Sequence, residues 1–323
     1  MLFDMSDVQP SSVDSELLRV EQEILSIKNV RDRFGKVIRS TIDQLLDGER
    51  TGRYDFKQLC KTEKTHAGTL IEINLQREFG FADGRDMDFS IAGTDVDCKY
   101  SKDLGGWMIP PEALDEICLV VWANDKDSAW SAGLLRASRT KLTENGGVTR
   151  KGNRDSKYRL NQSNLHLVRW LWHKEPLGEN TLLHLDPQVR AKILEGTSGQ
   201  QRVNQLFRLV QGRLIRREVV RTVAQQADYM ARIREDKKMT RARPALRQEG
   251  IIILGHGGSH TAIARALEVP VPKLGEFISL RITRALPEHA GRPSAELWGA
   301  RWVVASPGDK IEPLLQPLDR SAD

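Results

Sequence analysis

Apolar positions in the first half of the chain pass from a helical spacing to runs typical of strands. At 15–46 they recur every three or four residues, and 62–79 shows a second helical stretch for which Thr62 or Thr65 is the expected cap. Short β-rich runs follow at 86–91, 95–100, 117–123 and 129–135. This alternation of helix and strand predicts an α/β core with a central mixed sheet.

The pattern changes in the second half of the chain. A polar, glycine-rich stretch at 143–156 indicates a loop, and the charged stretch at 171–179, with its proline and glycine, indicates a linker. Three helical segments follow, at 200–211, 215–224 and 227–234, and then a β-rich run at 250–255. This order predicts a winged helix-turn-helix, a module whose second helix enters the major groove of DNA. The predicted domains are 1–170 and 180–323, joined by the linker.

Positive charge is concentrated in the predicted winged-helix part. The whole chain has a formal net charge of +5 and a pI of about 9.1, which favours an anionic partner. Between residues 201 and 250, however, 13 Arg or Lys stand against 5 Asp or Glu. A solvated helix face is the alternative to a DNA-binding surface for such a run. The residues expected to contact phosphates or bases are Arg232, Arg234, Lys237, Lys238, Arg241 and Arg243.

Cysteine content and hydropathy exclude several classes of protein. Three cysteines are too few for a disulfide framework and lack the spacing of a zinc site, so we expect a reducing, cytoplasmic environment. No segment has the pattern of a signal peptide, and no run of about 18 apolar residues predicts a membrane span. We therefore expect no membrane partner.

Two acids and a lysine lie at strand spacing near the centre of the first half. Side chains alternate along a strand, so Asp97 and Lys99 face the same side, with Asp88 nine residues before Asp97. Carboxylates bind hard divalent cations, and a neighbouring lysine can orient water or stabilise charge on a phosphate. Glu72, on the preceding helical stretch, could complete the site. The sequence therefore predicts an α/β nuclease core, with a salt-bridged surface strand as the alternative. Asp95 faces the same side as Asp97 and Lys99 and would either support the site or be solvated.

Longer segments resemble the NaeI-type (type IIE) restriction endonucleases. The similarity runs from about residue 42 to residue 301, through both halves of the chain. Its segments are TGRY (51–54), KTEKTH (61–66), TLIEINLQREF (69–79), DVDCKYS (95–101), GGWMIPPEA (105–113), SGQQRVN (198–204), VAQQ (223–226) and EGIIILG (249–255).

The resemblance implies an activity, a set of site residues and an assembly. It places the catalytic set on Glu72, Asp88, Asp97 and Lys99, with the three acids as ligands of Mg²⁺. It also implies an N-terminal nuclease domain and a C-terminal, catabolite-activator-like winged domain, in a homodimer that binds two copies of a short palindromic site on double-stranded DNA. The copy bound by the C-terminal domain would act as an effector, and the enzyme would belong to a restriction-modification system.

Two other functions remain compatible with the same residues. A nicking endonuclease of the mismatch-repair type can share the catalytic core but would cut one strand. A non-catalytic DNA-binding regulator would use the winged helix alone, and its acids and lysine would form only salt bridges.

Overall fold

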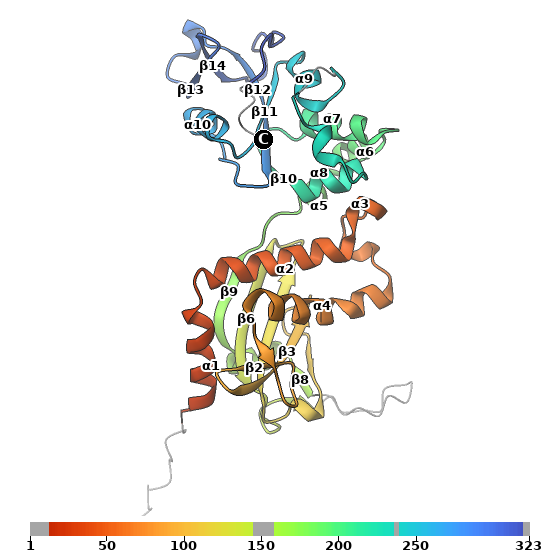
Figure 1. Cartoon of the computed structure of the whole chain (residues 1–323), viewed down its shortest axis with the longest axis vertical. Helices are drawn as coiled ribbons and strands as arrows, with labels where there is room; N and C mark the ends of the chain where they lie inside the picture. The colour runs from red at the N-terminus through yellow and green to blue at the C-terminus, as the bar shows by residue number, and fades with distance from the viewer. Residues whose placement is uncertain (1–12, 145–157, 236–238, 319–323) are drawn as a thin grey trace, which may run out of the picture. The chain divides into compact units, whose positions relative to one another are not determined.

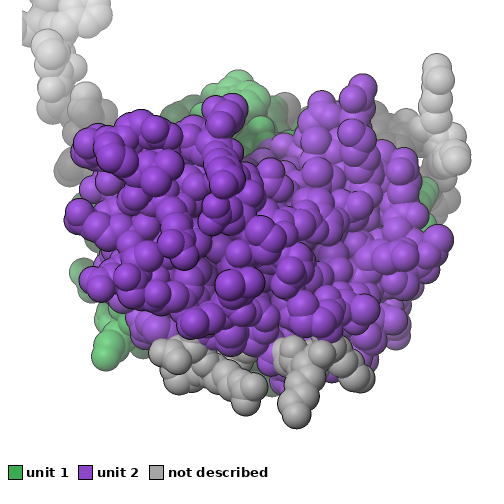
Figure 2. All heavy atoms as spheres, turned by 90° about the horizontal axis from the view of Figure 1, so that it is seen from above, with its two compact units in different colours: residues 1–45, 59–179 green, residues 46–58, 180–323 purple. Residues whose placement is uncertain are grey.

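The chain folds into two compact units that interleave along the sequence. The computed structural model describes residues 13–144, 158–235 and 239–318. The first unit comprises residues 1–45 and 59–179, and the second comprises 46–58 and 180–323 (Figures 1 and 2). A short segment from the first part of the chain is therefore incorporated into the second unit.

The helices of the first unit follow the predicted pattern closely. The stretch at 15–46 forms two helices, α1 (Ser15–Ser26) and α2 (Val30–Leu46), which are separated where Asn29 adopts a left-handed φ of 55°. Helix α4 (Lys61–Phe79) matches the predicted 62–79. Its cap differs from the expected threonines, because it starts after Cys60, whose backbone N–H donates to the Glu63 carboxylate at 2.8 Å.

A mixed six-stranded sheet forms the centre of this unit, as predicted. Strand β3 pairs in parallel with β5, while the other neighbours are antiparallel. In spatial order the strands are β1 (Ala82–Asp83), β2 (Phe89–Ile91), β3 (Thr94–Ser101), β5 (Ile117–Asn124), β6 (Ala129–Arg136) and β9 (Arg169–Pro176). A smaller sheet contains β4 (Trp107–Ile109), β8 (Tyr158–Leu160) and β7 (Thr143–Glu144). Most of the loop expected at 143–156 lies outside the described residues.

The linker expected at 171–179 differs from the structure. Its first residues belong to β9, which pairs with β6 at the edge of the sheet, so only 177–179 separate this strand from the second unit. The charged residues and the proline misled the sequence interpretation, because an edge strand with one solvated side tolerates both.

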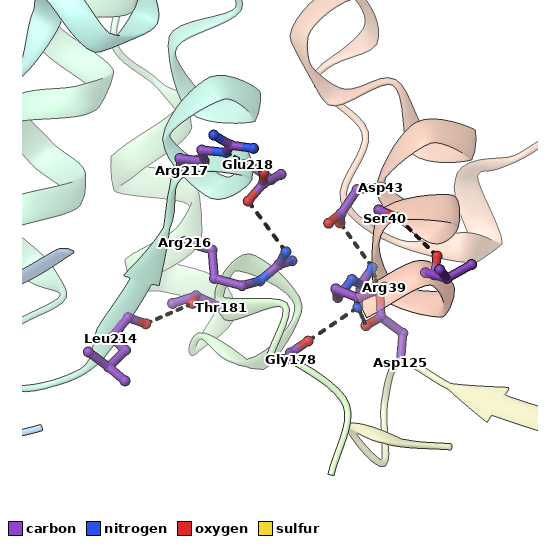
Figure 3. A network of polar contacts seen from close by, with 11 residues as sticks. Arg39, Ser40, Asp43, Asp125, Gly178, Thr181, Leu214, Arg216, Arg217 and Glu218 are labelled. Carbon is purple, nitrogen blue, oxygen red and sulfur yellow. Dashed lines mark hydrogen bonds and ion pairs between the residues drawn. The ribbon is translucent and has the colours of Figure 1, made fainter. Parts of the chain in front are cut away.

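A buried arginine joins three segments of the first unit (Figure 3). Arg39 of α2 is 5% exposed and forms ion pairs with Asp43, one turn further along α2, and with Asp125, after β5. It also donates to the carbonyl of Gly178, after β9, at 3.4 Å. One guanidinium thus connects a helix to two loops at the end of the sheet.

The second unit combines short helices with an antiparallel sheet. Strands β10 and β11 both pair with β12. Strand β12 also pairs with β14, and β14 pairs with β13. The helices are α3 (Gly48–Thr51), α5 (Thr181–His184), α6 (Pro187–Leu194), α7 (Gly199–Leu209), α8 (Arg217–Ala224), α9 (Ala242–Arg247) and α10 (Gly258–Ala266). The strands are β10 (Leu214–Arg216), β11 (Ile251–Leu254), β12 (Glu276–Arg284), β13 (Ser294–Leu297) and β14 (Ala300–Val304). Short 3-10 turns occupy Phe56–Gln58, Pro111–Ala113, Gln162–Leu167, Tyr229–Arg232 and Pro287–His289.

The helices expected at 200–211 and 215–224 are present as α7 and α8, although α8 is preceded by strand β10. At 227–234 the structure has only the 3-10 turn Tyr229–Arg232. The next helix is α9, which has only six residues. So short a segment contains too few apolar positions to show a helical spacing. Among the described residues, no helix is both long and apolar enough to cross a membrane.

Candidate active site

The four residues of the predicted nuclease site come from neighbouring elements of the first unit. Asp97 and Lys99 lie on β3, and Asp88 directly precedes β2, the antiparallel neighbour of β3. Glu72 lies on α4, which packs against β3. The Lys99 Nζ is 2.6 Å from Asp97 Oδ1 and 3.9 Å from Asp88 Oδ2. The lysine is thus paired with both aspartates.

Hydrogen bonds from the strands hold the two aspartates in place. The backbone N–H of Cys98 donates to Asp88 Oδ2 at 2.7 Å. The thiol of Cys118, the β5 partner of Asp97 in the parallel register, lies 3.7 Å from Asp97 Oδ2 and donates to it. Burial raises the pKa of this thiol well above its usual value, so it remains a donor. Both carboxylates therefore keep one oxygen bonded to the protein scaffold.

Burial and crowding of negative charge define the electrostatics of the site. Burial raises the pKa of Asp97, and the charge of Asp88 adds to this rise while Lys99 opposes it. The pKa of Glu72 is also raised, first by burial and then by Asp88. Burial opposes the charge on Lys99, but its hydrogen bond and ion pairs with the aspartates raise its pKa overall. Three acids with one lysine leave an excess of negative charge that favours a bound cation.

The donor atoms suit a hard cation, although they do not form a closed cage. Carboxylate oxygens are the ligands that Mg²⁺ and Ca²⁺ prefer. Within residues 13–144, 158–235 and 239–318, no three His, Cys, Asp or Glu side chains are grouped closely enough to hold a metal ion. The arrangement therefore fits a cation bound by one or two carboxylates and completed by other oxygens, as is usual for Mg²⁺.

Asp95 on the same strand is bound to a neighbouring loop. Its carboxylate accepts backbone N–H groups from Asp86 at 2.9 Å and from Arg85 at 3.1 Å. These bonds, with that of Asp86 first, lower the pKa of Asp95. Sequence reasoning left its role open because the partners are backbone atoms, which no residue pattern identifies.

The predicted DNA-contacting residues of the second unit do not form one exposed set. Arg232 pairs with Asp228 at 2.9 Å and Arg234 is exposed, while Arg241 is half-buried at the start of α9. Arg243 is only 8% exposed. Lys237 and Lys238 lie outside the described residues.

One side of α8 contacts the chain's own 46–58 segment. Helix α3 packs on α8, where Glu49 forms an ion pair with Arg221 and Gly48 lies against Thr222. A Cβ on Gly48 would be 2.0 Å from Thr222 Oγ1, so the two helices approach as closely as glycine permits. Arg217 and Arg221 of α8 still have side chains that are 57% and 52% exposed, and the entry of this helix into a DNA groove stays a prediction.

Comparison with known proteins finds similarity over most of the chain. A family model described as "Restriction endonuclease NaeI" matches residues 18–313. The type II restriction enzyme NaeI of Lentzea aerocolonigenes is 47% identical over 311 residues, which cover 94% of this chain and 95% of that protein. The resemblance inferred from the sequence motifs is thereby confirmed.

Proposed function

This chain belongs to the NaeI restriction endonuclease family and is a site-specific deoxyribonuclease; we propose that it cuts both strands of DNA at a short palindromic site, with Glu72, Asp88, Asp97 and Lys99 as its catalytic set. The observation that carries this assignment of residues is the pairing of Lys99 with Asp97 and Asp88 beside the helix that bears Glu72. A surface salt bridge would not require a third acid or a buried Asp97.

Each residue has a role that follows from its position. Lys99 keeps its charge because the aspartates raise its pKa, so it orients the attacking water and stabilises negative charge on the scissile phosphate. Asp88 and Asp97 would hold Mg²⁺, and Glu72 would complete the site or position water. When bound, the metal supplies a positive charge that stabilises the phosphate oxygens during hydrolysis. Mg²⁺ is preferred over a softer metal because every candidate ligand is a carboxylate.

The second unit is proposed to be a catabolite-activator-like winged helix-turn-helix that binds an effector copy of the site. Its elements α7, β10, α8, α9, β11, α10 and β12 follow one another along the chain, with β10 and β11 paired on either side of β12. Three helices followed by antiparallel strands support the proposal. Helix α3 packs on one side of α8, and we assign the approach to DNA to the region around α9, which includes Arg232, Arg234 and Arg241.

A homodimer suits this activity. In a two-fold dimer each subunit reads one half of a palindrome by the same contacts, so the two strands are cut at equivalent positions. We place cleavage in the first unit and effector binding in the second, and we expect the enzyme to act in the cytoplasm within a restriction-modification system.

Cleavage of a plasmid with two copies of the site tests the activity and its residues. The wild-type protein with Mg²⁺ should give linear fragments with both strands cut. Asp97→Ala should still retard the DNA in a mobility-shift assay while its cleavage falls by several orders of magnitude. Intact plasmid with the wild-type protein would refute the proposal, and cuts in one strand only, read on a denaturing gel, would point to the nicking alternative.

The effector model needs a separate experiment. Cleavage of a one-site plasmid should accelerate when a site-bearing oligonucleotide is added. Replacing both Arg232 and Arg234 with Ala should weaken this activation, and at saturating effector the cleavage rate should recover. A wild-type rate that does not respond to the oligonucleotide would exclude two-site activation.

A further inference from the structure

The loop that precedes β2 is folded around the carboxylate of Asp95. The Arg85 N–H lies 3.1 Å from both Asp95 oxygens, and the Asp86 N–H lies 2.9 Å from Oδ2. Asp95 lies on β3 opposite Ser90 of β2, so its side chain lies beside the loop that enters β2. Successive backbone N–H groups that point at one anion form a concave binding site for it. The loop therefore gains its shape from an acid on the neighbouring strand.

The same loop is tightly constrained at its start. A Cβ on Gly84 would lie 2.2 Å from the carbonyl oxygen of Met87 and 2.9 Å from that of Phe89. Only glycine allows the chain to fold back this closely. Because residues 84–87 are held by this turn and by Asp95, the position of the next residue, Asp88, is determined by the same contacts.

Asp88 contacts both strand β3 and the lysine of the site. Its Oδ2 accepts the Cys98 N–H at 2.7 Å and lies 3.9 Å from the Lys99 Nζ. A shift of the loop by one ångström would lengthen this 2.7 Å bond from Cys98 beyond the range of N–H···O hydrogen bonds. The geometry of Asp88 thus depends on the loop before it and on the strand beside it.

We propose that Asp95 is a positioning residue, which holds the 84–87 loop so that Asp88 faces Lys99 and the cation. Asp95 does not touch the reacting atoms and acts through the Arg85 and Asp86 amides. The inference rests on the proposed role of Asp88 as a metal ligand. It replaces the alternative that Asp95 is a solvated surface acid.

Amide hydrogen exchange without metal tests the structural part of the proposal. In full-length Asp95→Ala, the peptide that contains Arg85 and Asp86 should exchange faster than in the wild type, because those amides lose their acceptor. Asp86→Asn is the matched control, since the Asp86 side chain is exposed on the same loop and only its backbone contacts Asp95. Unchanged exchange in Asp95→Ala would overturn the proposal.

Titration with magnesium chloride tests the link to the site. In Asp95→Ala the Mg²⁺ concentration for half-maximal plasmid cleavage should rise about 10–100-fold, as is typical when a residue that orients a metal ligand is removed. Binding of DNA in EDTA and the melting temperature should stay near the wild-type values. Asp95→Asn, which keeps one acceptor oxygen, should fall between the wild type and Asp95→Ala, and it serves for both measurements if Asp95→Ala does not fold.

The outcomes separate this inference from the proposed function. If the wild type cleaves and the Asp95 variants need no more Mg²⁺ than the wild type, the positioning role is wrong and the function stands. If the wild type itself does not cleave, the proposed function fails, while the exchange experiment still decides whether Asp95 orders the loop.

Discussion

Replacing Arg39 with methionine should strongly destabilise the first unit. Arg39 and Asp125 each have side chains 6% exposed, and Asp43 is 18% exposed, so the substitution leaves two largely buried carboxylates without their shared cation. The loss of the ion pairs between this buried guanidinium and the two carboxylates is the dominant cost, because methionine preserves much of the volume of the arginine stem.

The magnitude follows from the buried pair. Removing one partner of a buried ion pair costs about 3–5 kcal/mol. In a unit of this size each kcal/mol lowers the melting temperature by about 2–4 °C, so the transition of the first unit should fall by about 6–20 °C. None of these groups lies in the second unit, so the unfolding transition of that unit is an internal reference.

Differential scanning calorimetry measures this shift, and Arg31→Met is the matched control. Arg31 lies on the same helix, but its side chain is 59% exposed, and its pairs with Asp32 and Glu175 are long, at 3.6 and 3.8 Å. Such exposed pairs contribute about 0–1 kcal/mol. Equal shifts in the two variants would refute the argument. Adding Asp125→Asn to Arg39→Met should restore part of the stability, because it removes one of the buried charges.

Two further predictions concern pH and packing. The pKa of Asp14 is lowered, chiefly by its hydrogen bond to Arg136. The stabilisation that results is present above the usual Asp pKa of 3.8, and it is lost as the pH falls through the lower pKa of the folded state. Asp14→Asn should therefore be less stable than the wild type at pH 6, and urea titrations should show this difference shrinking below about pH 4; a constant difference would contradict the linkage. Gly48→Ala should destabilise the second unit by about 1–3 kcal/mol, because its Cβ would overlap Thr222. Gly68→Ala, with nothing within 4 Å of its Cβ, should be neutral or stabilising in the same urea assay.

Much of the local structure could be predicted from the sequence. The helical spacing at 15–46 and 62–79 and the β-rich runs of the sheet correspond to α1, α2, α4, β2, β3, β5 and β6, because a buried face imposes its period on the residues that form it. The same alternation places Asp97 and Lys99 on one face of a strand, where their atoms lie 2.6 Å apart. Those relations span only a few residues, so the sequence contains them directly.

Other features depend on which segments meet in space. The charged stretch at 171–179 favours a linker, but most of it lies in β9, a strand that pairs with β6. Pairing partners far apart in sequence leave no local signal. Likewise, the 46–58 segment joins the second unit, where its helix α3 contacts α8. Arg243, expected among the DNA contacts for its charge, is buried. Charge gives no information about burial when the partners come from distant elements.

The candidate site combines both kinds of information. The sequence by itself determined the acid and lysine chemistry on β3 and, through long shared motifs, the family. Only the tertiary structure brought Glu72 on its helix and Asp88 before its strand to that lysine, and only it showed that Asp95 binds the loop before Asp88. The physical reason is that spacing along one strand is set by covalent geometry, whereas contacts between a helix, a loop and a strand are set by how the whole unit packs.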